Sequence, residues 1–432
     1  MGISKCRLCE SSKLYTVLEM GTFSLSGVFP EQPNDPVSRG PLTLMLCQDC
    51  SLVQLSESFR ASEMYGDNYG YRSGLNPSMV KHLEEIVDYS KTFVNLKHDD
   101  VVLDIGSNDG TLLRNYDQQL KKIGIDPTSA KFADFYDESS MAIAGFFDRK
   151  TFLQQSPKSA TIITSIAMLY DLEDPVAFAM DIKACLALDG VWVFEQSYMP
   201  WMILTGAYDT ICHEHIEYYS LTSILEMLRR AGLSAIDVEI NGANGGSIRV
   251  TASHLKEGLE VTQTVCDLID WEESINLCSV EFFVKFSEYV LRHGIALKQL
   301  VNSYRHEGKR VLALGASTKG SILLQHADLK QKDIGAVAEI NEFKFARWMA
   351  NSDIPIRKES DALLKEFDVY LILPWHFKGT FSKRLEGFLE KGATIVWPLP
   401  NLQVQTAKET ITVDQVATSM RVPSQLSGTI FK

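Results

Sequence analysis

Short apolar runs alternate with stretches of helical periodicity along the middle of the chain. Four runs of five or six residues, each too short for a buried helix, are predicted as strands at residues 101–105, 122–126, 160–165 and 190–195. A helix is expected from residue 77, where apolar side chains recur at intervals of three or four, and another is expected to include residues 181–188. Strands that alternate with helices in this way predict an α/β fold with a parallel sheet.

The same alternation returns in the second half of the chain. Helical periodicity is present at residues 224–232 and 284–300. Apolar runs predict further strands at residues 235–240, 309–314, 334–340 and 368–373. The run at 309–314 is closed by a glycine turn, as is typical of a first Rossmann strand. A second Rossmann-like α/β domain is therefore expected at the C-terminal end.

The composition is that of ordinary globular domains. The chain has 432 residues, of which 45% are hydrophobic, and this length predicts two or three domains. No uncharged apolar run reaches the roughly 18 residues that a membrane span requires, and residues 1–9 lack the apolar core of a secretory signal. The formal net charge of −13 argues against neutralisation of a nucleic-acid backbone. We expect a cytoplasmic protein without nucleic-acid or membrane partners.

Four of the eight cysteines form two C-x-x-C pairs near the N-terminus, Cys6 with Cys9 and Cys47 with Cys50. In a reducing compartment, such pairs are typical of thiolate ligands for tetrahedral zinc rather than of disulfides. The long spacer between them is rich in glycine and proline, which suits a loop between two knuckles. Four thiolates leave no open coordination position, so the zinc is expected to be structural. The alternatives are a pair of redox motifs or cysteines that occur at this spacing by coincidence.

The first predicted strand leads into a glycine turn, Gly106-Ser107-Asn108-Asp109-Gly110, that is expected to bring main-chain N–H groups close to a ligand. Asp104 precedes the first glycine by two positions, which differs from the G-x-G-x-x-G fingerprint of dinucleotide sites. The acidic pattern is typical of class I methyltransferases, whose cofactor S-adenosylmethionine carries an ammonium and a sulfonium. Asn108 replaces the middle glycine, and asparagine tolerates a left-handed backbone.

Further cofactor candidates follow the next strands. Asp126 ends the second strand, where a carboxylate can accept the ribose hydroxyls of NAD or of S-adenosylmethionine alike. On these features alone, a Rossmann-like domain for a different nucleotide is the alternative. The candidate cofactor residues are Asp104, Gly106, Ser107, Asn108, Asp109, Gly110, Asp126, Pro127, Phe146, Phe147 and Ser165.

Two other segments carry side chains suited to acid–base chemistry. The tyrosine-rich loop at residues 65–73 contains Tyr69 and Tyr71, which are candidate hydroxyl donors to a substrate oxyanion, and packing is their alternative. The segment His213-Glu214-His215 places imidazoles, which titrate near neutral pH, beside a carboxylate. Metal binding by two imidazoles and a buried structural role are the alternatives for this segment.

Together these motifs resemble the sugar C-methyltransferases, which act on nucleotide-linked keto-deoxyhexoses. The resemblance runs from about Cys6 to Pro400 and also includes residues 208–220 around the His-Glu-His segment. Three downstream motifs belong to it: Gly245-Gly246-Ser247-Ile248-Arg249-Val250, Gly315-Ala316-Ser317-Thr318-Lys319-Gly320 and Leu373-Pro374-Trp375. Cys212 departs from the pattern, because well-matched members commonly carry an aromatic hydroxyl at this position.

The resemblance implies an α/β enzyme with an N-terminal zinc-binding module, a central class I methyltransferase Rossmann-like domain and a C-terminal second Rossmann-like domain. We accordingly divide the chain into a zinc-binding module with its linker loop (1–75), a methyltransferase domain (76–220), a sugar-nucleotide domain (221–405) and a tail (406–432). It also implies methylation of a ring carbon, with C-3 beside a 4-keto group favoured, through an enolate. By family position His215 is the base, with Glu214 and His213 beside it.

The nucleotide-diphosphate-linked keto-deoxyhexose is expected between the two Rossmann-like domains. Ser317 and Lys319 supply a hydroxyl and an ammonium at a predicted helix start, which suits a diphosphate. Ser247, Arg249 and Trp375 are further candidate substrate contacts. The alternative is that the C-terminal Rossmann-like domain only supports the fold and does not bind the substrate. The oligomeric state is not determined by the sequence, and a monomer is compatible with it.

Two other functions fit parts of the pattern. A zinc-containing RNA methyltransferase would share the cysteine knuckles and the cofactor turn, but the net charge argues against it. A sugar-nucleotide-binding protein without methyl transfer would leave the cofactor turn vestigial, yet Asp104, Gly106, Gly110 and Asp126 are all intact.

Overall fold

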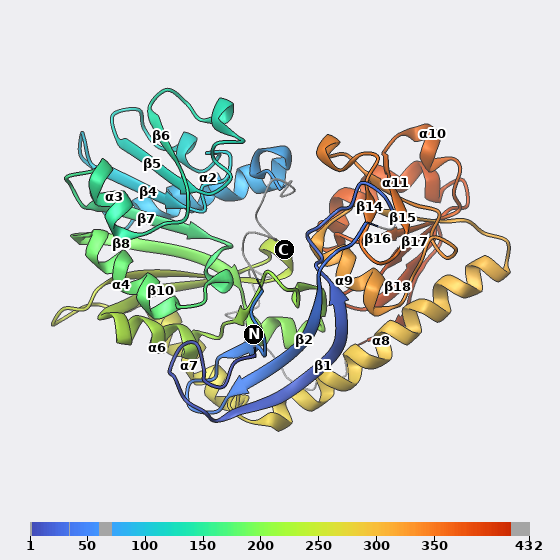
Figure 1. Ribbon diagram of the computed structural model, residues 1–432, viewed down its shortest axis with the longest axis horizontal. Coiled ribbons are helices and arrows are strands. Elements are labelled where there is room, and N and C mark those ends of the chain that lie inside the picture. The colour runs from blue at the N-terminus through green and yellow to red at the C-terminus, as the bar shows by residue number, and fades with distance from the viewer. Residues whose placement is uncertain (1, 34, 60–70, 416–432) are drawn as a thin grey trace.

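The computed structural model describes residues 2–33, 35–59 and 71–415. Two α/β lobes stand side by side, and a pair of long N-terminal strands crosses beneath and between them (Figure 1). Each of these three parts is built on its own sheet, of seven, eight and four strands respectively. The α/β class predicted from the alternating pattern is confirmed.

The N-terminal sheet has the order β1-β2-β3-β9 and is antiparallel throughout. Its strands are β1 (Leu14–Ser24), β2 (Arg39–Cys47), β3 (Val53–Leu55) and β9 (Glu217–Tyr218). Three of them come from the N-terminal segment, whereas β9 is supplied from more than 150 residues further along the chain. The last strand of the zinc-module sheet therefore belongs to the segment that carries the predicted base.

The central sheet has the order β10-β11-β8-β7-β4-β5-β6. Its strands are β4 (Val101–Ile105), β5 (Lys121–Asp126), β6 (Ser140–Ala144), β7 (Ala160–Ile166), β8 (Leu186–Ser197), β10 (Leu233–Asn241) and β11 (Ser247–His254). The first five run parallel, and the last two form an antiparallel hairpin on the β8 edge. The strand predicted at 101–105 is β4, and all five of its residues are buried, as a strand covered on both faces requires.

Helices cover both faces of this sheet (Figure 1). They are α2 (Pro77–Lys91), α3 (Arg149–Gln155), α4 (Pro175–Cys185), α6 (Leu221–Ala231) and α7 (Gln263–Ser274). The short helix α5 (Met199–Thr205) follows β8, and its Met199, Met202 and Ile203 are buried in the same cluster as the N-terminal sheet. The helix expected to include residues 181–188 ends earlier, at Cys185, because Leu186 already pairs with Ala160 as the start of β8.

The division at residue 220 needs a correction. The hairpin of β10 and β11 follows that position, and its strands hydrogen-bond to β8 of the central sheet rather than to the C-terminal sheet. The reason is topological, because an antiparallel hairpin can extend the edge of a parallel sheet without a crossover helix. We propose that the central domain continues to the end of β11 at His254.

The C-terminal sheet has the order β14-β15-β13-β12-β16-β17-β18-β19. Its strands are β12 (Val311–Leu314), β13 (Ala336–Glu339), β14 (Trp348–Met349), β15 (Ile354–Lys358), β16 (Val369–Ile372), β17 (Thr394–Trp397), β18 (Leu402–Gln405) and β19 (Thr410–Asp414). Its helices are α8 (Val280–His306), α9 (Thr318–His326), α10 (Asp361–Leu364) and α11 (Lys378–Leu389). The predicted tail begins at residue 406, but β19 pairs with β18 and so belongs to this sheet.

A single hydrophobic core joins the zinc-module sheet to the C-terminal lobe. Leu44 and Leu46 of β2, Phe286 and Val290 of α8, and Leu323 of α9 are buried in the same cluster. The zinc module is therefore packed against the C-terminal lobe and is not a separate appendage. Across the described ranges, no helix combines the length and apolarity that crossing a bilayer would need.

Candidate active site and zinc centre

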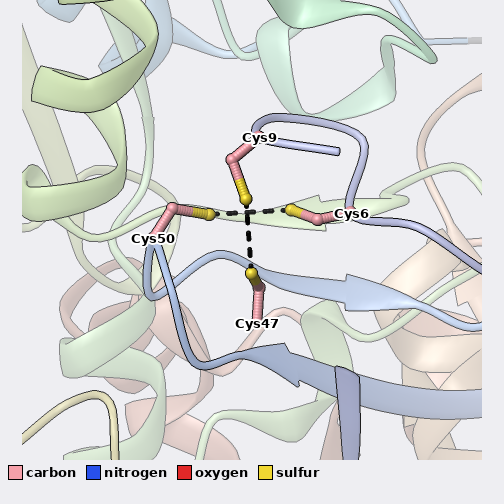
Figure 2. A group of neighbouring side chains, drawn as sticks. All are labelled: Cys6, Cys9, Cys47 and Cys50. Carbon is pink, nitrogen blue, oxygen red and sulfur yellow. Dashed lines mark hydrogen bonds between the residues drawn. The ribbon is translucent and has the colours of Figure 1, made fainter. Parts of the chain in front are cut away.

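The four predicted zinc ligands converge on one point (Figure 2). The sulfurs of Cys6 and Cys50 lie 3.6 Å apart, those of Cys9 and Cys47 lie 3.5 Å apart, and all four sulfurs lie within 4.8 Å of one another. A tetrahedron with zinc–sulfur bonds of about 2.3 Å has sulfur–sulfur edges of roughly 3.8 Å. The residues therefore fit a closed four-thiolate zinc site, and zinc is the structural metal of this protein.

The glycine turn after β4 adopts the left-handed conformations that its sequence predicts. Gly106, Asn108 and Gly110 have φ values of 75°, 49° and 70°. The main-chain N–H of Asn108 donates to Asp126 at 3.0 Å, which ties the turn to the end of β5. The turn and Asp126, the candidate ribose ligand, therefore lie together at the carboxyl ends of β4 and β5.

Two adjoining cavities lie against this turn, and Gly106, Ile166, Ala167 and Tyr71 line both. The larger, of about 170 Å³, is bordered by Asp126, Pro127, Phe146 and Phe147, as expected for a ribose and adenine site. The smaller is polar and is bordered by Asp104, Ser107, His82 and Glu195. An apolar cavity beside an acidic one fits the adenosine and the amino-acid ends of S-adenosylmethionine.

Asp104 is the carboxylate best placed for the cationic end of the cofactor. It is almost completely buried and accepts a hydrogen bond from the Thr164 hydroxyl at 2.7 Å. Burial, more than any neighbouring charge, raises the pKa of Asp104 to about 7. A bound ammonium would favour the ionised form of this carboxyl.

Other cofactor candidates have structural partners instead. The Asn108 and Asp109 side chains accept hydrogen bonds from the N–H groups of Ser73 and Gly74, which fastens the linker to the turn. The Ser165 hydroxyl accepts the indole N–H of Trp192 at 2.9 Å. These side chains shape the site but are directed at protein groups.

The His-Glu-His segment lies between the 3₁₀ turn η5 (Tyr208–Thr210) and β9. It has no regular structure of its own, and its position is set by its neighbours. The N–H of Leu55 in the zinc-module sheet donates to the Ile216 carbonyl at 2.9 Å, immediately after His215. The zinc module therefore fixes one end of this segment.

His215 has the hydrogen bonding of a proton acceptor. Its Nδ1 lies 2.9 Å from the Thr210 carbonyl, so Nδ1 carries the proton and Nε2 carries the lone pair. Burial lowers the pKa of His215 to about 3, with a further contribution from the nearby Lys319 charge. The imidazole is consequently neutral at pH 7.

The other two members of the segment face the protein interior. Nε2 of His213 donates to the Gly40 carbonyl at 3.2 Å, its ring packs edge-on against Phe59, and burial lowers its pKa to about 4. Glu214 accepts a hydrogen bond from the Ser26 hydroxyl at 3.2 Å, and burial raises its pKa. Both residues therefore bind the segment to the zinc module.

Tyr71 borders both cofactor cavities and a third, described below. Its carbonyl accepts a hydrogen bond from the Asn108 amide at 3.1 Å, which anchors the linker to the glycine turn. Tyr69, the other tyrosine candidate, lies outside the described residues.

Lys319 and Trp375 of the C-terminal lobe reach the central lobe. Nζ of Lys319 donates to the Asn244 carbonyl at 2.6 Å, and the indole N–H of Trp375 donates to Asp209 at 2.7 Å. Ser317 caps α9 by accepting the Gly320 N–H at 3.0 Å. The loop that carries His215 and the start of α9 therefore lie together.

Ser247 and Arg249 lie on β11 of the central sheet, and both are buried. Arg249 forms ion pairs with Glu195 and Glu239, each at 2.9 Å, and the Ser247 hydroxyl donates to the Ala243 carbonyl. Neither residue lines the cavities described in this subsection, and both side chains have protein partners.

Sequence reasoning missed several polar residues at the cavities. Glu195 ends a predicted strand and borders the polar cofactor cavity, so an acid at the carboxyl end of a strand was an available signal. His82 lies on α2, and no pattern in the sequence distinguishes it from other histidines.

A third cavity, of about 310 Å³, lies at the carboxyl edge of the C-terminal sheet and is lined by Ser317, Glu339, Lys344 and Arg384 among others.

A parallel sheet with an acidic glycine turn, a carboxylate after the second strand and a two-part cavity at its carboxyl edge defines an S-adenosylmethionine-dependent methyltransferase. Comparison with known families agrees. Residues 6–65 match a zinc binding domain, residues 79–238 a methyltransferase domain, and residues 242–400 a C-methyltransferase C-terminal domain.

Among curated proteins, C-methyltransferase NovU of Streptomyces niveus is 26% identical over 414 residues, which cover 95% of this chain and 98% of that protein. The three matched domains and this similarity identify the chain as an S-adenosylmethionine-dependent C-methyltransferase with an N-terminal zinc-binding domain. It uses S-adenosylmethionine to methylate carbon.

Solved structures overlap with a smaller part of the chain. A methyltransferase from Clostridium acetobutylicum is 13% identical, covers 41% of this chain and 92% of its own, and has a TM-score of 0.33. YcgJ of Bacillus subtilis is 13% identical, covers 41% of this chain and 100% of its own, and has a TM-score of 0.32. Overlap this low adds nothing to the assignment.

Proposed function

We propose that the protein methylates a nucleotide-linked 4-keto-6-deoxyhexose at C-3, beside the 4-keto group, with His215 as the base. One observation carries the proposal: Nδ1 of His215 is bound to the Thr210 carbonyl at 2.9 Å, so Nε2 is the accepting atom. A carbon acid beside a ketone requires such an acceptor. The resemblance to sugar C-methyltransferases supports the substrate class.

The reaction would proceed through an enolate. Nε2 of His215 removes the C-3 proton, and the electron pair of that C–H bond moves so that the ketone oxygen becomes an enolate oxygen. Tyr71, which borders all three cavities, is the candidate to donate a hydrogen bond to this oxygen. S-adenosylmethionine, when bound, supplies the methyl group that C-3 accepts.

Lys319 is the candidate handle for the diphosphate. It lies in the first turn of α9, where main-chain N–H groups and the helix dipole also favour an anion. The cavity lined by Ser317, Lys344 and Arg384 continues from this turn along the sheet edge, and we assign the nucleoside to it. The sugar would then lie between Lys319 and the cofactor cavities, next to His215.

The test combines purified protein and methyl-labelled S-adenosylmethionine with a panel of nucleotide-linked 4-keto-6-deoxyhexoses. We expect a product with one added methyl group on C-3, identified by mass and by NMR. His215→Gln should lower turnover by roughly 10²–10⁴-fold, because a positioned base contributes about that much. The affinity for S-adenosylmethionine should not change.

The matched control is His98→Gln, since His98 is exposed on the central lobe away from these cavities. Full activity of His215→Gln would remove the assigned base. Methyl transfer to RNA, or to an oxygen of the sugar, would refute the substrate or the enolate route respectively.

A further inference from the structure

Tyr170 and His215 come from different elements, and their rings are in contact. Tyr170 lies in the 3₁₀ turn η4 (Leu169–Asp171), just after β7. Its ring centroid lies 4.1 Å from that of His215, with the ring planes inclined by 50°. The main chains are joined as well, since the Ile216 N–H donates to the Tyr170 carbonyl at 2.9 Å. The Tyr170 ring thus contacts His215, and the Tyr170 main-chain carbonyl binds the next residue, Ile216.

The turn that carries Tyr170 also forms a wall of the cofactor site. Met168, which precedes η4, and Asp171, its last residue, border the larger cofactor cavity. Tyr170 is therefore flanked in the chain by two residues of the cavity wall, and its ring contacts the imidazole of the proposed base. Cys212 carries no aromatic ring, and its side chain is fully buried.

Two contacts together determine the orientation of an imidazole. The hydrogen bond from Nδ1 to Thr210 fixes one edge of the ring but leaves rotation about that edge. A second ring packed against the imidazole face removes this rotation, because aromatic pairs have preferred separations and angles. His215 has both contacts, so the lone pair on Nε2 keeps one direction.

We propose that Tyr170 is a positioning residue for His215, which acts through its ring by fixing the imidazole plane and excluding water from one face. The inference rests on the proposed role of His215 as base. It concerns the ring of Tyr170 and assigns no contact between the Tyr170 hydroxyl and the substrate.

Exclusion of water gives the proposal a readout that does not depend on the reaction. Burial is the main reason for the lowered pKa of His215, so removal of the covering ring should raise it toward the ordinary value of 6.5. The charge of Lys319 on α9 acts on His215. Asp209 on η5 interacts with Lys319, and Glu214 and Asp171 in the adjoining segments interact with Cys212. A substitution at Tyr170 leaves all four in place.

The experiment compares Tyr170→Leu with Tyr170→Phe in the full-length zinc-loaded protein. Histidine ring NMR would follow the titration of His215 without sugar substrate, with the resonance assigned by its loss in His215→Gln. Tyr170→Leu should raise the pKa of His215 and lower kcat by about 10–100-fold, as expected for a misplaced catalytic group, without changing KM for S-adenosylmethionine. Tyr170→Phe, which keeps the ring, should stay within about twofold of the parent in kcat.

Three results would overturn the proposal: an unchanged His215 titration in Tyr170→Leu, an unchanged kcat, or a loss in Tyr170→Phe equal to that in Tyr170→Leu, which would assign the effect to the hydroxyl. If Tyr170→Leu does not fold, Tyr170→Met serves with the same expectations. If the parent enzyme methylates no keto-deoxysugar, the proposed function fails, whereas the titration still decides the role of Tyr170.

Discussion

Lys319 of the C-terminal lobe donates a hydrogen bond of 2.6 Å to the main-chain carbonyl of Asn244, at the tip of the hairpin between β10 and β11. Asn244 and the following Gly245 have positive φ values of 53° and 94°, so the turn has a left-handed backbone at this contact. Gly245 lies against Trp375, where a Cβ atom would come within 2.8 Å of the indole. The two sheets thus meet at a lysine whose charge also acts on His215.

Replacement of Lys319 by methionine should separate substrate binding from cofactor binding. A charge-assisted hydrogen bond contributes about 1.5–3 kcal/mol, so KM for the sugar nucleotide should rise roughly 10–100-fold. The loss of a nearby positive charge should also raise the pKa of His215. Steady-state kinetics with each substrate varied in turn would measure this, with Lys365→Met at an exposed position as the control.

The affinity for S-adenosylmethionine should depend on pH through Asp104. The pKa of this buried carboxyl is raised to about 7 from an ordinary value of 3.8, so in the free protein it is largely protonated below pH 7. An ammonium prefers the carboxylate, and binding should therefore tighten as pH rises through about 7 and then level off. Calorimetry from pH 5.5 to 8.5 would show this, and Asp104→Asn should bind weakly with no such rise.

The same carboxyl gives a stability signature with a definite sign. A group whose pKa is higher in the folded protein than in the unfolded chain stabilises the fold fully below the unfolded pKa and loses that contribution as pH rises through the folded value. The Asp104 contribution should thus decline between about pH 4 and pH 7. Bound S-adenosylmethionine should raise Tm more at pH 8 than at pH 6.

The elements that could be predicted are those whose burial leaves a local pattern. β4 is apolar at every position except Asp104 because both of its faces are covered, and the glycine turn after it needs left-handed residues at Gly106 and Gly110. The four zinc thiolates were equally predictable, since C-x-x-C spacing is imposed by the metal geometry.

The arrangement of the site could not be predicted in the same way, because its residues are positioned by partners distant in the chain. β9 has only two residues, Glu217 and Tyr218, and exists because β3 pairs with them. Tyr170 is separated from His215 by 45 positions and has no motif around it. The end of α4 at Cys185 was misplaced since no glycine or proline marks it.

Loss of zinc should impair turnover more than cofactor binding. The zinc knuckles hold β2 and β3, and β3 pairs with β9 beside His215, whereas the cofactor cavities are built from the central sheet. Cys50→Ser should remove zinc, lower Tm and reduce kcat at least about tenfold, given apparent structural-zinc binding energies of about 10–16 kcal/mol. S-adenosylmethionine should still bind to the fraction that remains folded.

Metal analysis, calorimetry, steady-state kinetics and cofactor titration would measure zinc content, Tm, kcat and S-adenosylmethionine binding separately. Cys266→Ser is the matched control, because Cys266 is exposed on α7 away from the four-sulfur cluster. Unchanged kcat in a zinc-free, folded Cys50→Ser protein would contradict the placement of His215 by the zinc module.

Gly27 offers a finer test of that placement, because the loop after β1 touches the catalytic segment without contributing a zinc ligand. A Cβ atom at Gly27 would collide with the carboxylate of Glu214, which also accepts a hydrogen bond from Ser26. Gly27→Ala should therefore displace Glu214 and with it the adjacent His215, and a misplacement on the order of 1 Å can lower kcat about 10²-fold. Zinc content and S-adenosylmethionine affinity should stay at the parent values.

The control for this change is Gly379→Ala in α11, where a Cβ atom meets nothing within 4 Å. Because alanine favours a helix more than glycine does, this variant should be as active as the parent and equal or greater in Tm. If Gly27→Ala matched it in kcat, the loop would give way without moving Glu214, and the zinc module would act on His215 through β9 alone. Single-turnover kinetics at saturating S-adenosylmethionine would distinguish the two outcomes, since they report the chemical step rather than binding or product release.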